Sequence, residues 1–167
     1  MHEQLPAFLA FFKYSWVGEL VRGVPWLFEW LEAFHFIGFA LLIGVVGILD
    51  LRILGVARGI PVGPIHRLLP WAFIGFGINL ITGIGFFCSE PESYAYIWVY
   101  KLKMALIVLA GLNALWFRLA VYHEIEAWGE YVEATPRAKI ICGLSLSLWV
   151  GVLVAGRFIA YFSSGTL

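Results

Sequence analysis

Three histidines stand beside long apolar stretches of the chain and are the side chains best suited to hold a metal cofactor: His35, His66 and His123. An imidazole nitrogen is a common axial ligand of haem iron. Two histidines on separate antiparallel helices can approach the iron from opposite directions, as a b-type haem requires. We expect His66 and His123 on the same side of the molecule, where they predict one haem site.

Other candidate ligands are expected near His35, on the opposite side. Lys103 and Met104 stand near the start of a later apolar stretch, and Arg157 lies toward the end of the last one. Lys103 or Met104 can supply a sixth ligand to iron, and cations such as Arg157 can pair with the haem propionates. These residues predict a second haem b site. Cofactor-binding candidates are therefore His35, His66, His123, Lys103, Met104 and Arg157.

Glycines in the first two apolar stretches fit two interpretations. They remove side-chain bulk where a flat macrocycle can lie, or they allow close packing of helices in the membrane. Both interpretations stay open for the sequence alone. The glycines concerned are Gly38, Gly44, Gly47, Gly75, Gly77, Gly83 and Gly85.

Motifs of several enzyme classes are missing from the sequence. It has no nucleophile elbow, HExxH pair, phosphate-binding loop or CxxC pair. Histidines spread over two sides cannot form a zinc site with three or four ligands. An electron-transfer or accessory subunit is therefore a better hypothesis than a stand-alone enzyme.

The composition indicates whether the protein is surrounded by water or by lipid. Of the 167 residues, 62% are hydrophobic and only 13% are charged, whereas soluble domains are nearer half apolar and a quarter charged. The formal net charge is zero, which argues against nucleic acid as a partner. These figures exclude a water-soluble globule and a disordered chain, and they predict an integral membrane protein.

Four stretches are long and apolar enough to cross a bilayer as helices. Residues 5–20 combine aromatic and charged side chains, which is typical of an interfacial helix, and we expect this segment to be retained. The sequence thus predicts an all-α, polytopic four-helix membrane bundle over residues 1–167 as one domain. The spans are expected at about 35–54, 68–87, 99–121 and 140–162.

The distribution of Lys and Arg predicts the topology. We call the side where the first span begins face A and the opposite side face B. Face B collects six of the 11 basic residues and face A five, so the positive-inside rule makes face B cytoplasmic. Both termini are then periplasmic, in a bacterial inner membrane. Cys88 and Cys142 are expected at opposite faces, too far apart for a disulfide.

Polar side chains inside the spans lead to further expectations. Asn79 and Asn113 both fall near the midplane and can join the second and third spans by a hydrogen bond. Arg52 can extend to face B, while Asp50 is expected to pair with Arg67 or Arg118. Both features are interpreted as structural.

The segment from Trp26 to Trp71, with its early His35, DLRILG and HRLLPW, resembles a family of small bacterial four-helix membrane proteins that carries no established function. A lysine at the start of the third span also belongs to that pattern. The resemblance covers about residues 14–121.

A fainter resemblance is to the haem-binding membrane protoporphyrinogen oxidases and copper-resistance-type membrane domains. His35, Arg52 and either Lys101 or Lys103 match their pattern, which implies haem binding. The tryptophan expected midway along the first span is replaced by LLIGVV, and the expected Tyr-His is displaced to Tyr122-His123.

Three functional hypotheses follow. The first is a b-type cytochrome-like protein with one or two haems, which passes electrons between a quinone or redox-protein partner and a respiratory or redox complex. The second is a cofactor-free structural or assembly subunit, packed on other membrane subunits or on copies of itself. The third is a haem-dependent oxidase of the protoporphyrinogen oxidase type. A small transporter or channel is disfavoured because proline interrupts no span in mid-membrane.

Overall fold

The computed structural model of the chain describes residues 5–56, 59–60, 67–122 and 134–163. All regular secondary structure in these residues is helical, which confirms the predicted all-α class. In chain order the helices are α1 (Ala7–Lys13), α2 (Trp16–Gly23), α3 (Leu27–Leu54), α5 (Leu69–Ser89), α6 (Pro91–Ala95), α7 (Trp98–Ala120) and α9 (Pro136–Ser163).

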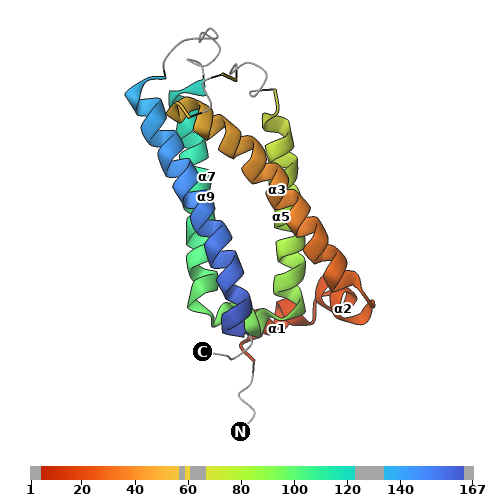
Figure 1. The fold of residues 1–167 in the computed structure, drawn as a ribbon. Helices are drawn as coiled ribbons and strands as arrows, with labels where there is room; N and C mark the ends of the chain where they lie inside the picture. The colour runs from red at the N-terminus through yellow and green to blue at the C-terminus, as the bar shows by residue number, and fades with distance from the viewer. Residues whose placement is uncertain (1–4, 57–58, 61–66, 123–133, 164–167) are drawn as a thin grey trace.

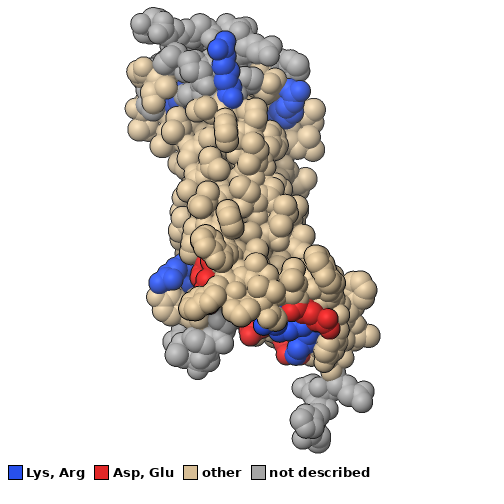
Figure 2. Space-filling view, turned by 90° about the vertical axis from the view of Figure 1, so that its right-hand side faces the viewer, with Lys and Arg blue, Asp and Glu red and all other residues tan. Residues whose placement is uncertain are grey.

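Four of these helices, α3, α5, α7 and α9, are long and apolar enough to cross a membrane. They run side by side as a bundle (Figure 1), which confirms the predicted four-helix membrane architecture. In Figure 2 the charged side chains gather toward the two ends of the molecule and leave an uncharged belt between them. That belt is the surface that contacts the lipid hydrocarbon.

The first span begins earlier than expected. α3 starts at Leu27 rather than near residue 35. Its first turns carry the exposed Glu29 and Glu32, which interrupt the apolar stretch from which the start was predicted. A hydropathy argument excludes such charged turns, but a helix can continue past the hydrocarbon into the polar interface. His35 consequently lies about two turns inside α3. The other spans match the expected positions to within a few residues.

Close packing of α3 on α5 depends on two glycines. A Cβ atom placed on Gly75 would lie 2.5 Å from the carbonyl oxygen of Gly38, and one on Gly38 would lie 2.9 Å from the carbonyl oxygen of Gly75. Both positions are thus filled by the opposing helix, which supports the packing interpretation for this pair. By contrast, Gly44, Gly47, Gly77 and Gly83 have nothing within 4 Å of an added Cβ.

The core changes partners along the bundle. In the face-B half, Leu49 and Ile53 of α3 pack with Ile141 of α9. In the face-A half, Ala155 and Ile159 of α9 instead pack with Val99 of α7. α3 therefore tilts away from α9 toward face A, as the ribbon shows (Figure 1).

The N-terminal segment forms two short helices rather than the single helix expected over residues 5–20. Ser15 causes the break, because its hydroxyl accepts a hydrogen bond from the Gly18 amide and so caps α2. Phe11 and Trp16 are 72% and 75% exposed, as expected of side chains at a membrane interface.

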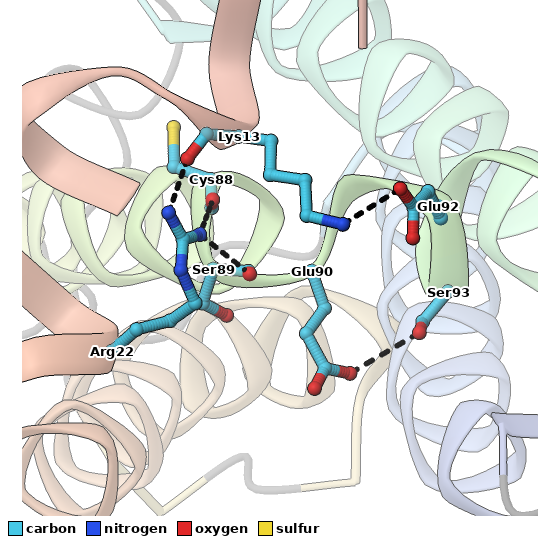
Figure 3. A network of polar contacts seen from close by, with 7 residues as sticks. All are labelled: Lys13, Arg22, Cys88, Ser89, Glu90, Glu92 and Ser93. Atoms are coloured by element: carbon cyan, nitrogen blue, oxygen red, sulfur yellow. Dashed lines mark hydrogen bonds and ion pairs between the residues drawn. The ribbon is translucent and has the colours of Figure 1, made fainter. Parts of the chain in front are cut away.

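Charged side chains fasten α1 and α2 across the face-A end of the bundle (Figure 3). Arg22 donates hydrogen bonds to the carbonyl oxygens of Cys88 and Ser89 at 3.0 and 2.8 Å, and so satisfies the C-terminus of α5. Lys13 of α1 pairs with Glu92 of α6 at 2.8 Å.

The expected pairing of Asp50 is corrected by the structure. Asp50 does not pair with Arg67 or Arg118; its carboxyl instead faces Ser145 and Cys142 of α9. Arg118 instead lies 3.9 Å from the centre of the Tyr122 ring. The rotation of α3 about its axis turns Asp50 toward α9, which residue types alone cannot reveal.

The two asparagines also differ from expectation, whereas Arg52 does not. Arg52 is buried and donates to the carbonyl oxygen of Ile60, which follows the face-B end of α3. Asn79 donates to Gly75 within its own helix, and Asn113 donates to Ile141 of α9. The expected bond between the second and third spans is therefore wrong.

The two cysteines behave as predicted. Cys88 lies in the last turn of α5 at face A, and Cys142 lies in the face-B half of α9. Both are buried free thiols.

Candidate functional site

His35 is held between α3 and α5 in the half of the bundle nearer face A. Its side chain is half-buried, and its Nδ1 atom lies 2.7 Å from Oγ1 of Thr82 on α5. The ring also meets Phe86 edge to face, with 5.4 Å between ring centres. Two neighbouring turns of α5 therefore fix the orientation of the imidazole.

The contacts of Thr82 determine which nitrogen of His35 carries the proton. The Thr82 hydroxyl lies 2.7 Å from the carbonyl oxygen of Ile78 and 3.3 Å from that of Asn79. Carbonyl oxygens only accept, so the single hydroxyl proton is donated to the backbone. Oγ1 must then accept from Nδ1–H of His35. In the neutral imidazole this assignment leaves Nε2 with a free lone pair.

Nε2 of His35 has no hydrogen-bond partner among the described residues. A histidine that ligates a metal commonly donates its other ring N–H to an oxygen acceptor, which fixes the tautomer and the ring orientation. The Thr82 hydroxyl provides that acceptor. His35 is thus presented as a nitrogen ligand or as a proton acceptor.

Lys103 brings a positive charge to the same site from the opposite pair of helices. It lies about one and a half turns inside α7, and its charge acts on His35. Its Nζ atom would lie 3.4 Å from a Cβ added to Gly156 of α9, so this glycine leaves room for the lysine chain. Each of the four long helices therefore contributes one residue at this level: His35, Thr82, Lys103 and Gly156.

Aromatic side chains lie on the face-A side of the site. The rings of Phe87 and Tyr100 stack at 13° with 5.9 Å between their centres, and Tyr94 of α6 packs on Tyr100 at 5.5 Å. The pKa of Tyr94 is raised, mainly by burial and further by the carboxylates of Glu90 and Glu32. Its phenol therefore keeps its proton, and remains a hydrogen-bond donor, to higher pH than usual.

The tyrosines and Thr82 did not emerge from the sequence as site residues. The segment CSEPESYAY reads as a polar connection, yet the short helix α6 carries Tyr94 to the edge of the site. Thr82 belongs to an apolar helix, and no feature of the sequence marks it as a neighbour of His35.

Other predicted site residues are not brought together with His35. Met104 follows Lys103 in the chain and is 37% exposed on the outer surface of α7. Arg157 is exposed and lies over the Tyr161 ring at 5.5 Å. His66 and His123 lie outside the described residues. Within the described ranges, no group of three or more His, Cys, Asp and Glu side chains is placed to hold a metal ion.

Comparisons with protein-family models, characterised proteins and solved structures give no match. The fold and the composition define a multi-pass helical membrane protein. The side chains around His35 are the feature that bears on a more specific function.

Proposed function

We propose that this chain is a b-type cytochrome-like membrane protein in which Nε2 of His35 ligates the iron of a haem b. The observation that carries the proposal is the hydrogen bond between Nδ1 of His35 and the Thr82 hydroxyl. That bond orients the ring and leaves Nε2 available, as is common for metal-bound histidine.

The residues around His35 fit a haem in two further respects. The rings of Phe86 and Phe87 provide an apolar surface for a macrocycle. Lys103 offers either a sixth ligand or a cation for a propionate. The glycine pair Gly38 and Gly75 adds no space, since each is filled by the opposing helix. A bound haem supplies one-electron redox chemistry.

A second haem between His66 and His123 is part of the same proposal. These two residues would place it near face B, opposite the His35 site. Two haems at opposite faces suit electron transfer across the membrane, with a quinone or a redox protein as partner. Arg157 and Met104 keep a lesser role, because their exposed side chains are turned outward.

Haem titration tests the His35 site directly. The apoprotein in detergent is titrated with hemin and compared with His35→Ala and with a His66→Ala/His123→Ala double variant. We expect the His35→Ala protein to bind one haem fewer than the wild-type chain. The double variant should keep the His35 haem.

The two lysines of α7 provide a matched pair for this titration. Lys103 faces the bundle and Lys101 is exposed, so Lys103→Ala should weaken binding while Lys101→Ala should not. An unchanged stoichiometry in His35→Ala, or a wild-type protein that leaves hemin free, would count against the proposal.

We further propose a bacterial inner-membrane location with both termini in the periplasm. The support is the excess of Lys and Arg at face B. Fusions of a green fluorescent protein to the C-terminus and of an alkaline phosphatase at the same position test it. A dark, phosphatase-active pair is expected, and a fluorescent, inactive pair would reverse the topology.

A cofactor-free subunit of a larger membrane complex is the second candidate, and α7 favours it. Only 11% of the apolar stretch of α7 is buried within the chain, against 33% in each of the other three long helices. A helix with so little intramolecular packing suits contact with other subunits or a second copy. A colourless protein from haem-replete cells, isolated in a particle larger than one chain, would favour this candidate over the cytochrome.

A further inference from the structure

A second buried polar group lies in the half of the bundle nearer face B, away from His35. It consists of Asp50 on α3, Asn113 on α7, and Cys142 and Ser145 on α9. The exposed fractions are 4% for Asp50, 8% for Asn113, 0% for Cys142 and 8% for Ser145. Three helices thus contribute polar side chains to this part of the interior.

Two oxygen atoms of this group have no hydrogen-bond partner among the described residues. The carboxyl of Asp50 faces Ser145 and Cys142, but its Oδ2 atom remains unpartnered there. The amide of Asn113 donates from Nδ2 to the Ile141 carbonyl oxygen at 3.1 Å, and its Oδ1 atom is likewise unpartnered. An acceptor buried without a donor costs about 1–3 kcal/mol, so two in one group require an explanation.

The side chains of Asp50 and Asn113 both face the same turn of α9. The Ile141 carbonyl, which binds Asn113, is also the acceptor for the Ser145 amide in an α-helix. The Asp50 carboxyl faces the Ser145 side chain and Cys142, which follows Ile141. The carboxyl and the amide therefore both lie against the turn from Ile141 to Ser145.

Charged neighbours do not satisfy the Asp50 carboxyl. Arg52, on the same helix, donates to the Ile60 carbonyl oxygen, and Arg118 of α7 lies over Tyr122. Of the titratable groups in the described part of α9, Cys142 faces Asp50, and its thiol is a weak donor. A lone carboxylate in such surroundings is very unfavourable, so the group lacks one positive charge or one donor.

The donor set favours a proton over a metal cation as the missing group. The described side chains offer the oxygens of Asp50, Asn113 and Ser145 and one sulfur, whereas hard cations such as Ca²⁺ and Mg²⁺ take six or more oxygen ligands. A single proton on Asp50 removes the charge. It also turns the carboxyl into a donor toward the unpartnered oxygen of Asn113.

We propose that Asp50 and Asn113 form a proton-binding site within the membrane-embedded bundle. A hydronium ion of the bulk solvent gives up a proton, which forms an O–H bond with Oδ2 of Asp50, so the carboxylate becomes neutral and a neutral water molecule is released. The O–H group then donates to Oδ1 of Asn113, so both unpartnered oxygens are satisfied. The site is independent of haem binding at His35.

Infrared spectroscopy of the full-length protein in lipid nanodiscs at neutral pH tests the site. A protonated carboxylic acid has a C=O stretching band, distinct from that of a carboxylate, which shifts on exchange into D₂O. We expect this band in the wild-type protein and its complete loss in Asp50→Asn. Glu92→Gln, which removes an exposed carboxylate paired with Lys13, should leave it unchanged.

A variant of the proposed acceptor provides a second reading. Asn113→Leu removes Oδ1 but keeps Asp50, so the band should persist and move to higher frequency because the acid loses its acceptor. This reading stands even where Asp50→Asn does not fold.

Two results would overturn the proposal. One is a wild-type spectrum without an Asp50-dependent acid band, as expected where a buried water leaves the carboxylate ionised. The other is loss of the band on adding Na⁺ at constant pH, which would make the site a metal-cation site.

Discussion

At the scale of single residues, the direction in which the Thr82 hydroxyl donates its proton determines which nitrogen of His35 is protonated. The Thr82 side chain donates to the backbone of its own helix and must therefore accept from His35. At Asp50 and Asn113, one oxygen atom of each side chain lacks a donor among the described residues. At both sites the proposed chemistry follows from the number of donors and acceptors, since the surrounding lipid offers no water to replace a missing partner.

The role of Thr82 can be separated from its size. Thr82→Val keeps the shape of the side chain but removes the acceptor for Nδ1–H, whereas Thr82→Ser keeps the hydroxyl. Outer-shell partners of metal-bound histidine are typically worth about 10–100-fold in affinity. We expect a loss of that order in hemin affinity for Thr82→Val and little loss for Thr82→Ser, measured by titration of each apoprotein.

Equal affinities of the Val and Ser variants would show that Thr82 does not orient the imidazole. A parallel thermal melt distinguishes this role from a general loss of stability, because Thr82→Val should unfold near the wild-type temperature.

At the scale of helices, the contact of α3 with α5 positions the site, since His35 and Thr82 come from these two elements. The backbones approach at Gly38 and Gly75, where an added Cβ would collide with carbonyl oxygens of the opposing helix. Backbone atoms cannot rotate away as a flexible side chain can, so the helices have to separate to accept even a methyl group.

Gly75→Ala should therefore destabilise the protein, and Gly77→Ala should not. Overpacking costs about 1–3 kcal/mol and outweighs the roughly 1 kcal/mol by which alanine is the better helix former. Gly77 has open space around it, so Gly77→Ala gains the higher helix propensity of alanine without any overpacking. Chemical unfolding of both variants in detergent, followed by circular dichroism, measures the difference.

The contact of α3 with α5 also predicts a functional effect. Gly75→Ala should weaken hemin binding together with stability, because it separates His35 from Thr82. A Gly75→Ala protein as stable as Gly77→Ala would mean that the two helices do not approach as closely as described.

At the scale of the whole molecule, the bundle carries polar chemistry at two levels. His35, Thr82 and Lys103 lie toward face A, whereas Asp50 and Asn113 lie toward face B. Apolar packing separates them, with Leu42 and Val45 of α3 in one cluster with Trp149 of α9. The charged residues of the surface lie at the two ends, which suits a protein that spans a bilayer (Figure 2).

The sequence was sufficient to predict the membrane architecture. Span positions follow from the length of uncharged stretches, because the bilayer imposes that length on any helix. Only the start of α3 was missed, since Glu29 and Glu32 interrupt the apolar pattern where the helix has already left the hydrocarbon.

The site was predictable only in part. Residue type singled out His35 and Lys103, but the partners Thr82 and Tyr94 depend on how each helix is rotated about its axis. A span that is apolar all round contains no signal for that rotation. The predicted pairing of Asp50 with an arginine was wrong for the same reason. The opposite charges favoured the pair, but the sequence does not show toward which helix Asp50 points.

The most direct test of the central claim is the absorption spectrum of the protein purified from haem-replete cells. We predict a Soret band that shifts on reduction with dithionite and that falls in intensity in His35→Ala, while Lys101→Ala retains the wild-type spectrum. A preparation with no Soret band, or a His35→Ala spectrum identical to that of the wild-type protein, would contradict the assignment of His35 as a haem ligand.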